Sequence, residues 1–202
     1  MTGENSAHRL AIDCIYEALV RLMEIKPYKE ITITDITNKA GVSRMAYYRN
    51  YQDKDDILIN HLREEMEKAA SEFLRDKNPS HEEFWRRIIF SIVEDPINEH
   101  VVKAGLLDKT FESMLAYAMR IYREAFGLDL SDEQVMMMIY SKVGGLFGYM
   151  VYMIDRKDTM DMEAFAKGLG KLLESGMPFV EKPCITSYTE DEQTISREAD
   201  HL

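Results

Sequence analysis

The sequence predicts an all-α protein in which a small helix-turn-helix domain precedes a larger helical body. Apolar residues recur at helical spacing through most of the 202 residues, and no β-branched run of strand length alternates with period two. Glycine and proline are scarce, at 10 and 5 residues. Hydrophobic residues make up 46% and charged residues 30%, which is a globular composition, and the chain is long enough to bury a core without disulfides.

Two helices are expected before residue 41. Residues 7–25 form the first, because their apolar positions recur every three or four residues, and Pro27 marks its end. Thr32 opens the second, which continues through Lys39, since Thr32 and Asp35 fit a capping box.

A turn and two further helices follow. Gly41 stands where a turn of positive φ favours glycine. Ser43 is expected to cap a third, short helix that reaches about Tyr51. Asp53 can cap a long helix whose apolar side includes positions from Ile57 to Leu74.

The rest of the chain predicts a helical body and a tail. Four helices are expected, over residues 80–94, 108–126, 131–155 and 162–174. Asp95-Pro96 ends the first of them, Gly127 ends the second, and a capping box from Ser131 to Gln134 opens the third. The expected domains are residues 1–53 for DNA binding, 54–182 for dimerisation and ligand binding, and 183–202 as a flexible acidic tail.

The net charge of −11 is divided unevenly along the chain. Residues 1–54 hold eight basic and seven acidic residues, a net +1, whereas the others hold 17 basic and 29 acidic ones, a net −12. Within residues 36–54 four basic residues face one acidic residue. Acidic surface disfavours nucleic acid, but here it belongs to the body, so the first quarter of the chain remains a candidate for binding DNA.

The two short helices have the spacing of a helix-turn-helix. Apolar residues of the pair can lock it against the first helix, and the second helix then directs five residues outward: Arg44, Met45, Ala46, Tyr48 and Arg49. Arginine can bond to guanine edges, a tyrosine hydroxyl to phosphate, and apolar groups can meet thymine methyls. Helix N-termini near Thr32 and Asp53 add N–H groups suited to phosphates. The alternative is a helical pair used only for packing.

The segment from Ile31 to Leu58, ITITDITNKAGVSRMAYYRNYQDKDDIL, resembles the N-terminal domain of TetR/AcrR-type transcriptional regulators. The shared elements are a threonine that opens the first helix, Ala-Gly-Val-Ser in the turn, an aromatic cluster in the recognition helix, and a lysine that begins the long connecting helix. The match covers about residues 8–60, and its spacing, turn and flanking helices all agree.

The resemblance implies a TetR-like all-α fold and a homodimer that places two recognition helices in successive major grooves of a palindromic double-stranded DNA operator. It assigns Arg44, Met45 and Ala46 to bases, Thr32, Tyr48 and Lys54 to phosphates, and Arg49 to either, with Thr34 and Ser43 completing the DNA-binding set. Ala46 departs from the threonine or serine that is frequent in the family, which removes a hydroxyl contact. Met45 replaces a commonly small residue, so an apolar contact there can bear on operator choice.

The resemblance also implies a small-molecule inducer bound in the body. Methionine and aromatic side chains suit an adaptable pocket, and the candidate lining residues are Phe111, Met114, Tyr117, Tyr140 and Phe147. The alternative for any one of them is an ordinary place in the core or in a dimer interface.

Residues 135–154 are apolar enough to span a membrane and contain Gly144-x-x-x-Gly148. Lys142 lies inside this stretch and costs about 2.5–3.5 kcal/mol near a bilayer centre, so a buried helix is the better interpretation and no membrane partner is expected. By analogy with the family, the last two long helices pair with those of a second chain. The predicted dimer interface is Gly144, Gly145, Gly148, Tyr152, Phe165 and Leu169.

No enzyme activity, cofactor or metal is expected. His81-Glu82-Glu83 has Trp85 where a zinc-binding helix needs its second histidine, and no glycine-rich phosphate loop occurs. The two cysteines and a polar N-terminus favour a reducing, cytoplasmic location. The expected function is a ligand-responsive, homodimeric repressor that binds specific DNA sequences. The alternative is a co-regulator that acts through a protein partner.

Overall fold

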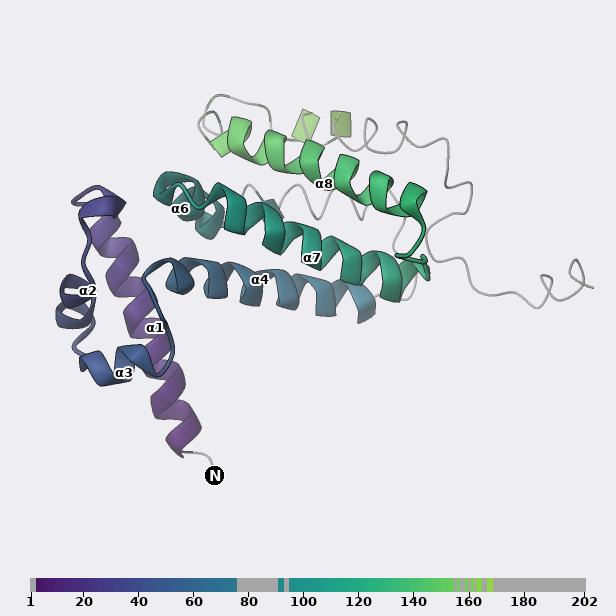
Figure 1. Ribbon diagram of the computed structural model, residues 1–202. Coiled ribbons are helices and arrows are strands. Elements are labelled where there is room, and N and C mark those ends of the chain that lie inside the picture. The colour runs from purple at the N-terminus through teal and green to yellow at the C-terminus, as the bar shows by residue number, and fades with distance from the viewer. Residues whose placement is uncertain are drawn as a thin grey trace, which may run out of the picture.

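The computed structural model describes residues 3–75, 91–92 and 95–154, together with residues 156, 159, 161, 163–164 and 167–168. Within these ranges the regular structure is helical throughout, as the sequence predicts. Three helices lie together at one end, α1 (Gly3–Met23), α2 (Ile33–Ala40) and α3 (Arg44–Tyr48). Three long helices lie beside one another in the body, α4 (Asp55–Arg75), α7 (Leu107–Phe126) and α8 (Glu133–Ile154) (Figure 1).

Local signals fix α2 as the sequence predicts. The Thr32 hydroxyl accepts a hydrogen bond from the backbone N–H of Asp35 at 3.1 Å, and the Asp35 carboxylate accepts from the backbone N–H of Thr32 at 2.9 Å. This is a complete capping box, in which each residue satisfies a donor that the helix start would otherwise leave free. Gly41 ends the helix at φ +67°, in the left-handed region that other residues rarely adopt.

Two clusters of buried side chains hold the helices together. The first joins α1, α2, α3 and the start of α4 with the short 3₁₀ helix η1 (Tyr28–Glu30) and with α6 (Pro96–Ala104). The second lies between α4, α7 and α8, around buried residues such as Ile121 and Ile139. Met66 of α4 packs against both clusters, so α4 connects the N-terminal helices to the body.

The helix α6 corrects the sequence interpretation, which has Asp95-Pro96 only end a helix. The Asp95 carboxylate accepts a hydrogen bond from the backbone N–H of Ile97 at 3.0 Å, and Pro96 occupies the first turn, where a missing N–H costs nothing. Gly105 ends α6 at φ +75°. The dipeptide that breaks a helical pattern on one side therefore starts a helix on the other.

Two further boundaries differ from expectation. The helix α3 ends at Tyr48, because the backbone N–H groups of Asn50 and Tyr51 both bond to the carbonyl of Tyr47 and turn the chain. The helix α8 begins at Glu133, and the Asp132 carboxylate, not Ser131, accepts from the backbone N–H of Gln134 at 2.8 Å.

The helix α7 agrees with its expected range, and Gly127 ends it at φ +62°. The expected helix over 80–94 lies outside the described residues apart from positions 91–92, and the tail at 183–202 lies wholly outside them. The expected last helix, over 162–174, is described only at positions 163–164 and 167–168.

Candidate nucleic-acid interface and cavity

One buried tyrosine orients the whole of α3. Tyr47 is fully buried, with its ring centroid 5.2 Å from that of Tyr48 and 5.6 Å from that of Tyr51. The helix start is fixed as well, because the Ser43 hydroxyl accepts from the backbone N–H of Ala46 at 3.1 Å. A five-residue helix anchored on one side must present the rest of its surface to solvent.

The predicted DNA-binding residues gather around this surface. Thr32, Thr34, Ser43, Arg44, Met45, Tyr48 and Arg49 are exposed, and Ala46 and Lys54 are half-buried. Met45 is 71% exposed and Tyr48 is 53% exposed, which is unusual for large apolar side chains. Lys39, exposed in the last turn of α2, is a further cation that the sequence analysis does not assign to DNA. Its only signal is its place in the basic stretch of residues 36–54.

A carboxylate lies at the start of α2, where a DNA phosphate is expected to bind. The Asp35 carboxylate that caps the helix also accepts a hydrogen bond from Lys26 Nζ at 2.7 Å. This contact and those with Thr32 hold the pKa of Asp35 well below its usual range, so the carboxylate stays charged. A phosphate that approached Thr32 would meet a carboxylate neutralised by Lys26, so Lys26 belongs to the electrostatics of this helix end.

The ammonium of Lys54 turns inward, toward the backbone. Lys54 Nζ donates to the carbonyl of Tyr28 at 2.6 Å and to the carbonyl of Ile31 at 3.0 Å, and it lies 4.4 Å from the centroid of the Tyr28 ring. Partial burial lowers the pKa of Lys54, although nearby Asp55 opposes the shift. Lys54 therefore ties the start of α4 to the segment before α2, a structural role that sequence reasoning misses. Its predicted phosphate contact would have to use the remaining N–H proton.

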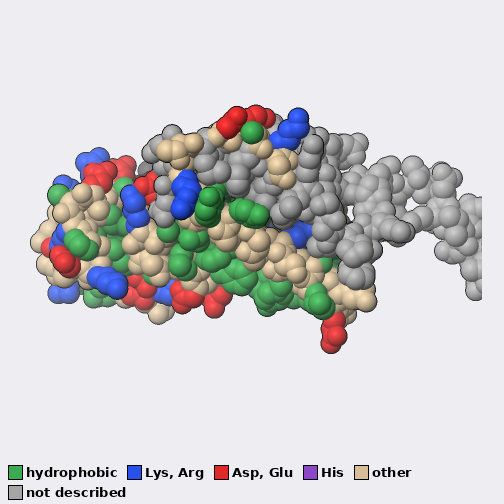
Figure 2. All heavy atoms as spheres, turned by 90° about the horizontal axis from the view of Figure 1, so that it is seen from above, with side chains coloured by type: hydrophobic (Ala, Val, Ile, Leu, Met, Phe, Trp, Pro, Cys, Tyr) green, Lys and Arg blue, Asp and Glu red, His purple; other side chains and the backbone are tan. Residues whose placement is uncertain are grey.

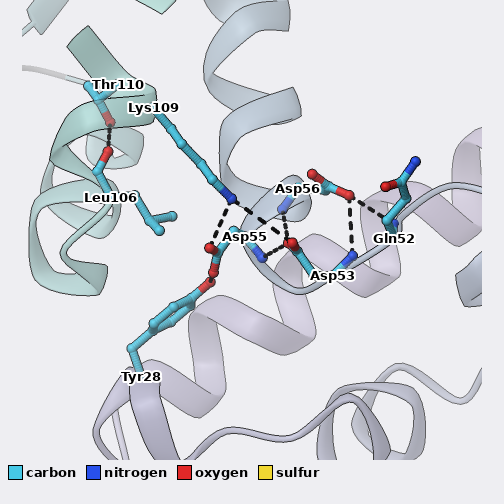
Figure 3. A network of polar contacts seen from close by, with 8 residues as sticks. All are labelled: Tyr28, Gln52, Asp53, Asp55, Asp56, Leu106, Lys109 and Thr110. Atoms are coloured by element: carbon cyan, nitrogen blue, oxygen red, sulfur yellow. Dashed lines mark hydrogen bonds and ion pairs between the residues drawn. The ribbon is translucent and has the colours of Figure 1, made fainter. Parts of the chain in front are cut away.

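A polar network joins this segment to the body (Figure 3). The Tyr28 hydroxyl donates to Asp55 at 2.6 Å, and Lys109 Nζ from the first turn of α7 donates to the other oxygen of the same carboxylate at 3.0 Å. Partial burial alone would raise the pKa of Asp55, but the hydrogen bonds from Tyr28 and Lys109 lower it below its usual value. Lys109 also lies 4.0 Å from Asp53, which caps α4 through the backbone N–H groups of Asp55 and Asp56. The network thus links η1, α4 and α7.

A cavity of about 450 Å³, partly open to solvent, lies between α4, α6, α7 and α8. Its lining is largely apolar and includes Met66, Ile92, Met114, Ile121, Val143 and Leu146. Polar groups from the same walls include buried Asn98 and Lys142 and the phenols of Tyr117 and Tyr122. Burial raises the pKa of Tyr117 to about 12, so this phenol stays protonated and can donate a hydrogen bond. An apolar cavity with a few polar groups is the usual form of a small-molecule site.

Two solved structures resemble this arrangement. The fatty acid degradation regulator FadR from Bacillus halodurans superimposes with a TM-score of 0.55 at 17% identity, over 82% of this chain and 98% of that one. The transcriptional regulator FadR from Bacillus subtilis, solved in complex with stearoyl-CoA, superimposes with a TM-score of 0.52 at 19% identity, over 84% of this chain and 98% of that one. The chain has the fold of these FadR regulators. No protein-family model matches the sequence, and no curated protein matches it.

Within this FadR-like fold, the cavity receives two of the five predicted ligand residues, Met114 and Tyr117. Phe111 and Phe147 are absent from its lining and pack edge-to-face against each other, with ring centroids 5.4 Å apart. Tyr140 is 48% exposed on the outer side of α8. Composition pointed to α7 and α8 but not to α4 or α6, and it could not show which face of each helix points into the cavity.

The outer side of α8 is exposed and carries no charge between Met137 and Tyr152. Its residues are spaced at helical intervals and are exposed except for half-buried Gly144: Met137, Tyr140, Ser141, Gly144, Gly145, Gly148 and Tyr152. A Cβ atom built at any of the three glycines meets nothing within 4 Å. Seen from above, the molecule shows hydrophobic side chains spread along the body with few charges among them, while charged side chains gather toward the end that carries α1–α3 (Figure 2). The other two predicted interface residues, Phe165 and Leu169, lie outside the described residues.

Of the described helices, α8 alone is long and apolar enough to cross a membrane, with a mean hydropathy of 1.2. Core helices of globular proteins pass the same test. The inner side of α8 belongs to the second buried cluster, and Lys142 on that side lines the cavity. The inner side of α8 therefore belongs to the core of the body, while its outer side is exposed.

Proposed function

We propose that this chain is a sequence-specific DNA-binding transcriptional regulator and that α3 is its recognition helix. The outward face of α3 carries the proposal. Tyr47 is buried on the inner side of the helix, and four exposed residues lie on the other sides: Arg44, Met45, Tyr48 and Arg49. A helix used only for packing would not need two arginines and two large apolar groups on its open side. The likeness of residues 31–58 to TetR/AcrR-type domains supports the same function, and we assign the chain to that type of regulator.

The regulator acts as a homodimer on a palindromic operator. The uncharged outer side of α8 supports a dimer, because small residues there allow a second helix to approach closely. A twofold axis then presents two copies of α3 to successive major grooves, about 34–36 Å apart. This geometry suits a cytoplasmic repressor that occupies its operator until the spacing changes.

A ligand with an apolar part, bound in the body, supplies that change. The cavity of about 450 Å³ is within the usual range for ligand sites, about 300–1,000 Å³. The helix α7 lines the cavity and also carries Lys109, which bonds to Asp55 beside the DNA-binding helices. Ligand binding would favour one position of α7 and hence one spacing of the recognition helices. Because the B. subtilis FadR was solved with stearoyl-CoA, a long-chain acyl-CoA is the first ligand to test.

DNA binding is tested by selecting bound sites from random DNA and measuring the shift of the selected duplex in gels at several salt concentrations. We expect Arg44→Ala to relax the preference at one base pair of each half-site by about 1–3 kcal/mol. Arg123→Ala is the matched control, because Arg123 is equally basic and exposed but lies on α7 in the body. Failure to select any sequence would remove the proposal and favour a co-regulator that acts through a protein partner.

Ligand response is tested by adding stearoyl-CoA to the complex of the full chain with the selected duplex. Loss of the shifted band, together with a higher midpoint of thermal unfolding of the protein, is the expected result. An unchanged band and an unchanged midpoint would show that acyl-CoA is not the ligand. The same titration with a free fatty acid separates recognition of the acyl chain from recognition of the coenzyme.

A further inference from the structure

Met45 occupies the centre of the open face of α3. It is two positions before Tyr47, which corresponds to about 160° around the helix at 3.6 residues per turn. Met45 therefore lies almost opposite the buried anchor, with Tyr48 three positions and Arg49 four positions further along on the same side. The Met45 side chain is 71% exposed, so it is the first group that a molecule docking on this face of α3 would meet.

The backbone beneath this side chain is held in place. The Ser43 cap fixes the first turn, and the backbone N–H of Arg49 donates to the carbonyl of Met45 at 3.2 Å. The ring of Tyr48 stands edge-on against Tyr47 with an angle of 87° between the ring planes. Met45 and Tyr48 thus form an apolar strip on a fixed backbone, with Arg44 and Arg49 at its two ends. The methionine side chain itself remains adaptable.

We propose, on the basis of the function proposed above, that Met45 selects thymine at one position of each operator half-site by contact with its 5-methyl group. The thymine methyl is the only apolar group that the four bases present in the major groove. A thioether offers no strong hydrogen bond, so it cannot reward a guanine, adenine or cytosine edge. Cytosine beneath it would also lose water from its amino group without a replacement partner, which adds a penalty.

Charge favours DNA over a protein as the occupant of this strip. Arg44 and Arg49 are exposed beside Met45, and residues 36–54 carry four basic residues against one acidic residue. The strip is small and surrounded by cations and hydroxyl groups, which suits an anionic duplex that presents a methyl group. A second copy of this acidic chain is the competing occupant, and the measurements below distinguish it.

The test uses the duplex selected by the full-length wild-type protein and replaces its thymines with deoxyuridine one at a time. This exchange removes a methyl group and leaves every hydrogen-bonding edge unchanged. We expect wild type to lose affinity about fourfold at one thymine of each half-site, the effect of exposing one buried methyl group. Met45→Ala is expected to bind the thymine duplex at least about fourfold more weakly than wild type does. Deoxyuridine at the same position should not lower the affinity of this variant further.

Two variants complete the experiment. Met45→Leu keeps an apolar side chain of similar volume and is expected to keep the sensitivity to deoxyuridine. Ile25→Ala removes another apolar side chain that is 71% exposed, in the turn after α1, and is expected to behave as wild type. All substituted positions are exposed, so loss of folding does not confuse the comparison.

The possible failures are distinguishable. Specific binding with no thymine whose methyl group depends on Met45 overturns this inference and leaves the proposed function standing. A change in oligomeric state of Met45→Ala on size-exclusion chromatography, without a deoxyuridine effect, assigns the strip to a protein contact and also overturns it. If no sequence is selected at all, the proposed function fails and the inference fails with it.

Discussion

Lys54 shows how one side chain can have a structural role that its position in a motif does not reveal. The resemblance assigns it to a phosphate, whereas two of its three donors bond to the carbonyls of Tyr28 and Ile31. The Tyr28 carbonyl belongs to η1 and also accepts from the backbone N–H of Ile31 at 3.1 Å, and Ile31 itself lies between η1 and α2. The lysine therefore stabilises the loop that delivers α2 and α3.

This geometry predicts a loss of stability on removal of the ammonium. We expect Lys54→Met to lower the free energy of unfolding by about 1–2 kcal/mol, because the charged hydrogen bonds to the carbonyls of Tyr28 and Ile31 are lost. Lys39→Met, at an exposed position of α2, is expected to change it by less than about 0.5 kcal/mol. Urea unfolding followed by circular dichroism measures both. Equal stability of the two variants would restore the view of Lys54 as a phosphate ligand only.

At the scale of elements, a stack of two rings is one of the contacts that join α1 to α4. The rings of Tyr16 and His61 lie parallel to within 14°, with centroids 3.7 Å apart. Burial lowers the pKa of His61, although nearby acidic groups such as Glu65 oppose the shift. The neutral imidazole is thus the form that fits between the two helices.

The contact between α1 and α4 is therefore expected to weaken in mild acid. In the unfolded chain, histidine takes up a proton near pH 6.5, whereas folded His61 takes it up only at lower pH. Its contribution to stability is complete above about pH 6.5 and is lost as the pH falls through the folded-state pKa. Urea unfolding at pH 7.5 and pH 5.5 should show a smaller decrease for His61→Phe, which keeps the stack, than for wild type. An equal decrease would assign the pH dependence elsewhere, for example to His100, whose pKa burial also lowers.

Helix ends explain which elements the sequence could predict. Thr32, Gly41 and Ser43 act through their own neighbours, so their patterns fix α2 and the start of α3 without knowledge of the fold. Asp95-Pro96 is ambiguous because the same two residues suit the end of one helix and the first turn of another. The helix α6 is stabilised by burial of Ile97 and Val101 in the first buried cluster, and this burial depends on the tertiary structure.

The candidate sites divide in the same way. The exposed face of α3 follows from a helix of known start and one buried tyrosine, so sequence predicts it well. The cavity needs the relative rotation of α4, α6, α7 and α8, which no local pattern contains. For this reason the sequence predicts both Met114 and Phe147 as ligand-binding residues, although only Met114 lines the cavity.

At the scale of the whole molecule, assembly should depend on the glycines of α8. We expect Gly144→Leu to convert the proposed dimer to a folded monomer, because the new side chain would separate two closely packed helices, whereas a Cβ atom at this position meets nothing within 4 Å in its own chain. Sedimentation equilibrium and circular dichroism measure mass and helical content. Ala116→Leu, a similar enlargement at an exposed position of α7, is expected to leave the mass unchanged. An unaltered mass for Gly144→Leu would place the dimer contact elsewhere.

The position of α6 also restricts how such a protein can be recombined. Four apolar residues of α6 and the turn after it help to bury the side chains of α1, η1 and α4, although about fifty residues of sequence separate them from α3: Ile97, Val101, Ala104 and Leu106. A chimera that joined residues 1–75 to an unrelated body would lack α6 and would leave the apolar side chains of α1, η1 and α4 that α6 covers exposed to solvent. The exchangeable unit is therefore discontinuous in sequence. A designer who transfers the proposed DNA-binding helices α1–α3 to another protein has to transfer residues 95–106 with them.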